Sequence, residues 1–278
     1  MIHAESLFAG YGPRTVLHGI DFDAGRGEHV AVLGTNGCGK TTFLHALSGL
    51  LRPQSGRVLL FGKDVAEMPP RRRAGRIAVM PQQSVCPPGM TVRHAVLLGR
   101  YPHLSWLGTF SEKDREIAEQ AMETTRTAAL AGRMLSELSG GERQRVMLAR
   151  TLAQQTPLIL LDEPAAHVDP AHAIELFDLL ERLRRKGLCI VTVMHDCNLA
   201  ALYATRMTGM KNGKILFEGP VGTVFSEACL SELYGTPVRV LRTGDYPCPV
   251  AVPANARGCP AGPAGDGAPV SEARIPGD

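Results

Sequence analysis

The chain lacks paired cysteines, long apolar runs and a strong excess of either charge. Its seven cysteines (38, 86, 189, 197, 229, 248 and 259) are odd in number and form no C-x-x-C pair, which favours neither disulfides nor a zinc site. No apolar stretch is long enough to span a bilayer. A net charge of +3 is too small to indicate nucleic-acid binding, and the one dense basic run, 71–73, is more typical of a solvated helix face.

The N-terminus also lacks the features of a secretory signal. Residues 1–5 have neither a charged n-region nor the start of an apolar h-region, so we expect the chain to remain in the cytosol. With 44% hydrophobic residues, 278 residues can form a normal core in one large domain or two small ones.

The most specific motif is a phosphate-binding loop, G-x-x-x-x-G-K-[ST], over residues 34–42. The apolar run 30–33 predicts a buried strand before it and 41–47 predict a helix after it, which is the context that the motif requires. Glycines let backbone N–H groups surround phosphate oxygens, and the helix N-terminus adds its positive end. Lys40 can neutralise the β- and γ-phosphates, and the Thr41 hydroxyl can ligate Mg²⁺. No internal repeat is visible, so we expect one nucleotide cassette.

Cys38 lies inside this loop. We interpret it as a small side chain there; the alternative is a thiol whose oxidation or alkylation affects nucleotide binding. The expected nucleotide-binding residues of the loop are Gly34, Asn36, Gly37, Cys38, Gly39, Lys40, Thr41 and Thr42.

Two carboxylates follow a second apolar strand, 158–161. Asp162 can complete the Mg²⁺ shell, and Glu163 is placed to polarise a water for in-line attack on a phosphate. A second anion site is expected at 138–142, Leu-Ser-Gly-Gly-Glu, directly before a predicted helix at 143–150. Two phosphate-binding devices in one domain suggest that two chains share each nucleotide.

Three further polar or aromatic residues stand at strand ends or in turns. His195 follows the apolar strand 189–194, where it can donate to a γ-phosphate. The Gln82 amide can reach Mg²⁺ or the attacking water and can couple the site to the helical segment after it, although the adjacent Gln83 leaves the register open. Tyr11, in a Gly-Tyr-Gly turn, can stack on adenine or be a simple exposed turn residue.

The remaining pattern divides the chain into strand-rich, helical and Pro/Gly-rich parts. A capping box at 111–114 starts a predicted helix that continues to about residue 130. An Asn-Gly turn at 212–213 predicts a hairpin. Further strands are predicted at 6–9, 16–22, 57–61 and 76–80, and a further helix at 171–186.

The order of these motifs resembles the nucleotide-binding subunit of ATP-binding cassette (ABC) transporters. The resemblance covers residues 1–241 and implies an α/β P-loop NTPase core with a mixed or parallel sheet, an antiparallel β subdomain and an inserted helical subdomain at about 84–155. The tail 242–278, rich in Pro, Gly and Ala, is expected to be disordered.

The resemblance implies an Mg²⁺-dependent ATPase that works as an ATP-sandwich homodimer. Ser139, Gly140 and Gly141 of one chain would bind the ATP held by the loop of the other, and Asp169 would communicate across the dimer. The implied catalytic residues are Glu163, His195 and Gln82, and the implied Mg²⁺ ligands are Thr41, Gln82 and Asp162.

Two strings, 99–103 and 230–238, resemble ATPases of ferric-siderophore, haem and cobalamin importers. This resemblance implies a subunit at the cytoplasmic face of the inner membrane, attached through integral-membrane permease subunits. A periplasmic or surface binding protein would be an indirect partner, and the chelate itself would contact other subunits.

Three alternatives stay open: an importer of another cargo such as zinc or manganese, a soluble ABC ATPase acting on DNA or ribosomes, and a non-hydrolysing regulatory module. The single cassette without heptads argues against the second, and the intact Lys40, Asp162, Glu163 and His195 argue against the third. The chain departs from the family pattern at Glu142, commonly Gln, and at 165–168, commonly a more polar loop.

Overall fold

A six-stranded sheet forms the centre of the computed structural model, which describes residues 1–82, 87, 89–104, 108–166, 168–242 and 248–254. The strand order is β10-β9-β3-β8-β7-β6, and only the β9–β10 edge pair is antiparallel. The strands are β3 (His29–Gly34), β6 (Ile77–Met80), β7 (Leu158–Asp162), β8 (Cys189–Met194), β9 (Arg206–Lys211) and β10 (Lys214–Pro220).

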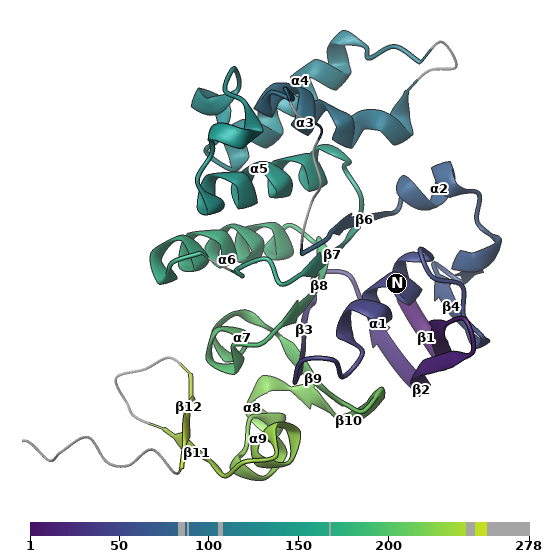
Figure 1. Cartoon of the computed structure of the whole chain (residues 1–278), viewed down its shortest axis with the longest axis vertical. Helices are drawn as coiled ribbons and strands as arrows, with labels where there is room; N and C mark the ends of the chain where they lie inside the picture. Colours follow the sequence, from purple (N-terminus) through teal and green to yellow (C-terminus); the bar gives the residue numbers. More distant parts are fainter. Residues whose placement is uncertain (83–86, 88, 105–107, 167, 243–247, 255–278) are drawn as a thin grey trace, which may run out of the picture.

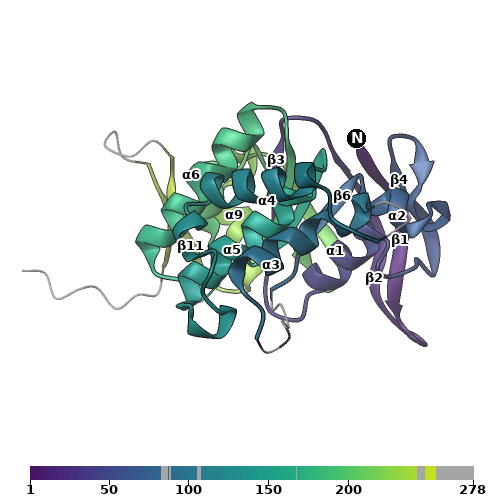
Figure 2. The same cartoon turned by 90° about the horizontal axis from the view of Figure 1, so that it is seen from above.

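The second sheet is antiparallel and has the order β2-β1-β4-β5. Its strands are β1 (Ile2–Tyr11), β2 (Arg14–Ala24), β4 (Ser55–Leu60) and β5 (Lys63–Asp64). Helix α1 (Lys40–Ser48) packs between the two sheets, because Phe43, Leu44 and Leu47 share one core cluster with strands of both. Figure 2 shows α1 beside this antiparallel sheet, at one side of the molecule.

Both faces of the central sheet are buried, which explains its uninterrupted apolar strands. In β3, Val30 and Val32 face the cluster with α1, whereas Ala31 and Leu33 face the opposite cluster with the larger helices. These helices include α5 (Gly140–Ala153), α6 (Pro170–Arg185) and α7 (Cys197–Tyr203).

A helical part is inserted between β6 and β7 and lies at one end of the molecule (Figure 1). Besides α5 it contains α3 (Val92–Leu97) and α4 (Glu112–Thr124), with short 3₁₀ turns at Leu98–His103, Ala128–Leu130 and Leu135–Glu137. The small helix α2 (Pro70–Ala74) and a turn at Val65–Glu67 precede β6. The expected P-loop NTPase architecture, with its antiparallel and helical subdomains, is therefore confirmed.

The helix predicted from the capping box is real but shorter than expected. Ser111 and Asp114 form the reciprocal capping bonds, yet α4 ends at Thr124 rather than near residue 130. The Thr125 hydroxyl bonds the Ala121 carbonyl at 3.1 Å, and Arg126 takes a left-handed conformation with φ of 56°. Clustered threonines, which compete for backbone carbonyls, thus terminate the helix.

The Asn-Gly turn joins β9 to β10 as predicted. Asn212 and Gly213 both have positive φ, 50° and 73°, the signature of a type I′ hairpin turn.

The C-terminal part differs from the expectation of a tail without structure. After α8 (Val221–Val224) and α9 (Glu227–Tyr234), β11 (Val238–Leu241) pairs with β12 (Val250–Pro253), which belongs to the expected tail. The remaining tail residues, 243–247 and 255–278, lie outside the described residues. Among the residues described, no helix has the length and apolar character needed to cross a membrane.

Candidate active site

The predicted phosphate loop connects β3 to α1, as the motif requires. Gly39 stands at the N-cap of α1 with φ of 109°, a conformation that side chains disfavour. A Cβ atom on Gly34 would lie 2.5 Å from both the Met210 carbonyl oxygen and Cys38 Sγ. Backbone close packing at the strand end therefore requires glycine at residue 34.

Lys40 is buried against its own loop. Its Nζ donates to the carbonyl oxygens of Gly34 at 2.9 Å and Thr35 at 3.0 Å. Burial lowers the pKa of Lys40, while Cys38 and the carboxylates of Glu163 and Asp162 act in the opposite direction. The ammonium is therefore close to the carboxylates at the end of β7.

Cys38 is buried as well, with 5% exposure. Burial raises the pKa of its thiol, so little thiolate forms at neutral pH. This environment favours the interpretation of Cys38 as a small packing residue over a reactive thiol.

Asp162, the last residue of β7, is almost completely buried. Its carboxyl hydrogen-bonds the Thr41 side chain, but its Oδ1 has no hydrogen-bond partner among the described residues. Burial raises the pKa of Asp162. A buried, unpaired carboxylate oxygen beside a threonine hydroxyl fits a hard cation such as Mg²⁺.

No group of three or more His, Cys, Asp or Glu side chains suited to a metal occurs in the described part of the chain. Because Mg²⁺ usually takes one or two protein ligands together with substrate phosphates, this sparse donor set suits a nucleotide-bound ion better than an all-protein site.

Two other predicted site residues meet at the Glu163 carboxylate. Its Oε1 lies 2.6 Å from Nε2 of His195, and its Oε2 accepts a hydrogen bond from Nε2 of Gln82 at 2.6 Å. The backbone of Glu163 is left-handed, with φ of 48°, and its N–H donates to the Val193 carbonyl at 2.9 Å. A non-glycine residue in this conformation costs on the order of 1 kcal/mol, which is common at functional sites.

The sheet explains why these side chains converge. Gln82, Glu163 and His195 come just after β6, β7 and β8, which are parallel neighbours, and the phosphate loop follows β3 beside β8. Parallel strands end at one edge of a sheet, so residues distant in sequence gather there.

Tyr11 ends β1 and bonds through its hydroxyl to Nδ1 of His45, on α1, at 3.1 Å. Tyr11 is 52% exposed. The hydrogen bond therefore fixes an exposed aromatic ring next to the helix that follows the phosphate loop.

The Ser-Gly-Gly string caps helix α5. Glu142 N donates to Ser139 Oγ at 3.3 Å, and Ser139 N donates to Glu142 Oε2 at 2.8 Å, a complete capping box. Bonds from Ser139 lower the pKa of Glu142, so the carboxylate found here in place of the commoner Gln is a charged cap. Ser139 and Gly140 are exposed, and no hydrogen bond in the described residues links 138–142 to the phosphate loop.

Asp169 caps helix α6: its Oδ1 accepts from His172 N at 3.0 Å, and its Oδ2 contacts His172 Nδ1. These bonds lower the pKa of Asp169. The ring of His172 lies against Gly141, since a Cβ there would be 3.6 Å from it. His172 thus joins Asp169 to the start of α5. The sequence analysis missed this contact. The one signal for it was that His172 is the third residue of a helix that begins with an Asp-Pro cap.

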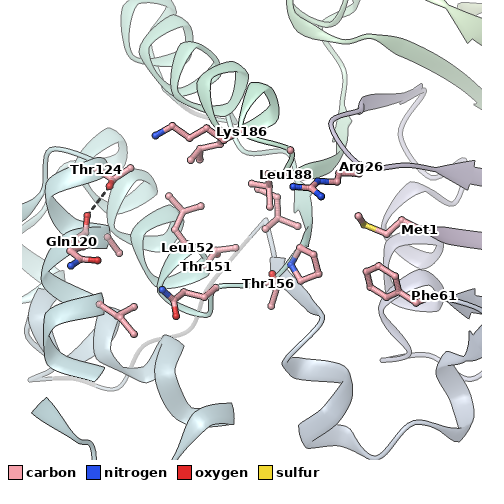
Figure 3. Close-up of a pocket in the computed structure, with 17 residues that line it drawn as sticks. Met1, Arg26, Phe61, Gln120, Thr124, Thr151, Leu152, Thr156, Lys186 and Leu188 are labelled. Carbon is pink, nitrogen blue, oxygen red and sulfur yellow. Dashed lines mark hydrogen bonds between the residues drawn. The ribbon is translucent and has the colours of Figure 1, made fainter. Parts of the chain in front are cut away.

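A separate cavity of about 530 Å³ lies at the opposite edge of the central sheet (Figure 3). Arg26, Thr156 and Leu188, which precede β3, β7 and β8, line it together with Lys186. None of the predicted site residues lines this cavity.

A phosphate loop at the end of one parallel strand, together with acidic residues at the end of another strand nearby, defines a P-loop NTPase. Residues 17–166 match the family model described as ABC transporter. The chain therefore belongs to the ABC transporter family, and it is an ATP-binding ATPase of that family, as its sequence predicted.

Curated relatives extend the match to almost the whole chain. It is 38% identical to the achromobactin transport ATP-binding protein of Dickeya dadantii (strain 3937) over 91% of this chain and 94% of that protein. It is 40% identical to a probable siderophore transport system ATP-binding protein of Bacillus subtilis (strain 168), over 85% and 91% of the two chains.

Solved structures agree with this assignment. The inward-facing conformation of a putative metal-chelate type ABC transporter matches with a TM-score of 0.79 and 27% identity, over 91% of this chain and 96% of that one. A dimeric post-hydrolysis ABC cassette bound to ADP and Pi matches with a TM-score of 0.71 and 26% identity, over 80% and 99%. Cassettes of this family thus bind adenine nucleotides and form dimers.

Proposed function

We propose that this chain is the ATP-hydrolysing subunit of an importer for an iron–siderophore complex or a related haem or cobalamin chelate. The names of the relatives and the strings at 99–103 and 230–238 support this cargo class. In this proposal residues 1–241 are the nucleotide-binding domain, attached to the cytoplasmic face of the membrane through permease subunits. A substrate-binding protein outside the membrane delivers the chelate.

The convergence of Gln82 and His195 on Glu163 carries the catalytic part of the proposal. Glu163 acts as general base and takes a proton from the attacking water. Gln82 orients that water, and His195 turns from Glu163 to donate a hydrogen bond to the γ-phosphate. Both partners are already within hydrogen-bond distance of the base, so the three side chains are gathered before ATP binds.

The phosphate loop and Tyr11 bind ATP in this proposal. Loop N–H groups and Lys40 hold the phosphates, with Gly34, Asn36, Gly37, Cys38, Gly39, Thr41 and Thr42 as the other contacts. Thr41, Asp162 and Gln82 hold Mg²⁺, which neutralises charge on the β- and γ-phosphates. The unpaired Asp162 Oδ1 supports this role.

A second copy of the chain completes each site. Ser139, Gly140 and Gly141 form the N-terminus of α5, and no hydrogen bond among the described residues links them to their own phosphate loop. This helix N-terminus therefore suits a phosphate held by a partner chain. Asp169 communicates across the homodimer, and its contact with His172 beside Gly141 gives it a path to the partner-facing string.

The permease docks, in this proposal, at the junction between the helical part and the core. A cavity of about 380 Å³ there is lined by Leu50, Pro81, Tyr101 and Met147. Leu50 and Tyr101 are 65% and 68% exposed and line the same cavity, so a partner seated there would cover both. Pro81 precedes Gln82, so a partner seated here touches the segment that reaches Glu163.

Reconstitution tests both cargo and mechanism. The full chain, with candidate permease and binding protein in vesicles, should hydrolyse ATP faster when the matching ferric chelate, haem or cobalamin is present. Glu163→Gln should bind ATP and dimerise but lose about 100-fold or more in turnover, because the amide cannot accept the proton.

The outcomes separate the two parts of the proposal. Stimulation by zinc or manganese instead of any chelate would overturn the cargo, and wild-type turnover in Glu163→Gln would overturn the general base. Lys113→Gln, an exposed residue at the start of α4, is the matched surface control and should behave as wild type.

A further inference from the structure

The loop that carries His195 is held by a side chain from a distant helix. Tyr234, the last residue of α9, donates its hydroxyl to the His195 carbonyl oxygen at 3.3 Å. The same hydroxyl hydrogen-bonds the side chain of Cys197, two residues after His195. Burial, together with Cys197 and Asp196, raises the pKa of Tyr234, so its hydroxyl stays a protonated donor.

Helix α7, which begins at Cys197, is fixed on a second side. Asn198 donates through Nδ2 to the Ala251 carbonyl at 3.1 Å and accepts at Oδ1 from the Ala251 N–H at 2.7 Å. Asp196 caps the same turn by accepting from Asn198 N and Leu199 N at 2.9 and 3.0 Å. The turn after His195 is therefore held by the cap at Asp196 and by the bonds of Asn198 to β12.

The elements that hold this loop are joined to one another. Val238 N on β11 donates to Ser231 Oγ on α9 at 2.9 Å, and Val240 N donates to Glu227 Oε1 at 3.1 Å. Strand β11 pairs with β12 over four residues. We call α9, β11 and β12 the C-terminal clamp. Figure 1 shows it at the opposite end of the molecule from the helical part.

We infer that Tyr234 is a positioning residue for His195, and that the C-terminal clamp exists in part to fix the backbone of the histidine loop. The inference rests on the proposed role of His195. The imidazole must exchange Glu163 for a phosphate oxygen, and a backbone fixed at residues 195–198 confines that exchange to side-chain rotation. A displacement of about 1 Å in a reacting group can cost about 100-fold in rate.

Tyr234→Phe tests the inference because it removes one hydroxyl and keeps the packed ring. For the full-length chain we expect kcat for ATP to fall about tenfold while KM changes less than about twofold, since the residues proposed to bind ATP are untouched. Tyr203→Phe is the matched control: its hydroxyl, at the end of the same helix α7, donates to Asp178 Oδ1 at 2.7 Å. Its kcat should stay at the wild-type value.

A double-mutant cycle with His195→Ala separates positioning from general destabilisation. If Tyr234 acts through His195, Tyr234→Phe should slow the His195→Ala chain by less than about twofold. An equal tenfold loss in both backgrounds, or wild-type kcat in Tyr234→Phe, would overturn the inference. Wild-type turnover in His195→Ala would instead overturn the proposed role of His195 and remove the basis of the inference.

Discussion

At the scale of single residues, the site concentrates unfavourable features that a ligand would relieve. Asp162 is a buried carboxylate with one unpaired oxygen, and its neighbour Glu163 has a strained backbone. Buried unpaired charges are costly to stability. Such features at a strand end are typical of residues that are kept for ligand binding at a cost to stability.

Asp162→Asn should therefore raise the stability of the nucleotide-free chain and weaken its stabilisation by MgATP. The pKa of Asp162 is raised on folding, so the folded state holds its proton more tightly and loses stability as pH rises above about 4. At neutral pH we expect a gain on the order of 1 kcal/mol, or about 2–4 °C in Tm, measured by calorimetry. Adding MgATP should raise the Tm of the wild type more than that of the variant.

A variant that is destabilised in the absence of nucleotide would show that the Asp162 carboxylate has a stabilising partner. The same experiment in EDTA is the control, because the rise in Tm caused by ATP alone should differ less between the two proteins than the rise caused by MgATP.

The sequence predicted the residues whose roles depend on local pattern. The phosphate loop, Asp162, Glu163 and His195 follow recognisable strands, and the parallel sheet explains why they meet. Tyr234 and Asn198 make their contacts with residues that are distant in sequence, and no local pattern marks such contacts.

At the scale of elements, the string at 99–103 is a structural anchor for the helical part. Arg100 is buried and donates from Nε to Asp114 Oδ1 at 2.9 Å, and from an η nitrogen to the Ala153 carbonyl at 2.8 Å. A Cβ on Gly99 would lie 2.2 Å from the Arg150 carbonyl oxygen. The segment thus connects α4 to the end of α5 and presents the exposed Tyr101 beside them.

Arg100→Met should destabilise the chain by about 3–5 kcal/mol, because it leaves Asp114 buried without its cationic partner. Urea unfolding measures the change. Arg93→Met is the matched control, since Arg93 pairs with Glu119 at 2.9 Å but both side chains are largely exposed, and it should cost less than about 1 kcal/mol. If both variants lost the same free energy of unfolding, the claim that burial makes the Arg100–Asp114 pair more important would be wrong.

Element boundaries were harder to predict than element types. The capping box correctly placed the start of α4, but its end depended on how the threonines at 124, 125 and 127 bond to carbonyls. Strand β12 was missed because it is only four residues long and lies in a Pro-, Gly- and Ala-rich tail. Its contacts with β11 and Asn198 are not visible in the local sequence.

At the scale of the whole molecule, stability should depend on pH through a histidine far from the active-site edge. His29, at the start of β3, is fully buried, bonds Thr192 Oγ1 at 2.7 Å and stacks on Phe177. Burial lowers the pKa of His29 from 6.5 to about 4.

The unfolded chain therefore takes up this proton first as the pH falls. The stabilisation is complete above about pH 6.5, is lost progressively between pH 6.5 and 4, and amounts to about 3 kcal/mol. Urea unfolding across pH 4–7 gives the free energy of unfolding of the wild type and of His29→Gln. The difference between these two free energies should shrink by this amount as the pH falls. A constant difference for His29→Gln would refute the linkage.

The order of strands in the central sheet has a consequence for synthesis of the chain. Strand β3, which leads into the phosphate loop, lies between β8 and β9 in the described sheet. Val30 can therefore pair only after Val191 and Arg206 have been synthesised. At 5–20 residues per second, a ribosome needs roughly 8 to 30 s to cover that interval. A nascent chain that stops before β8 has no neighbour for β3, so nucleotide can first be captured only after about two thirds of the protein has been made.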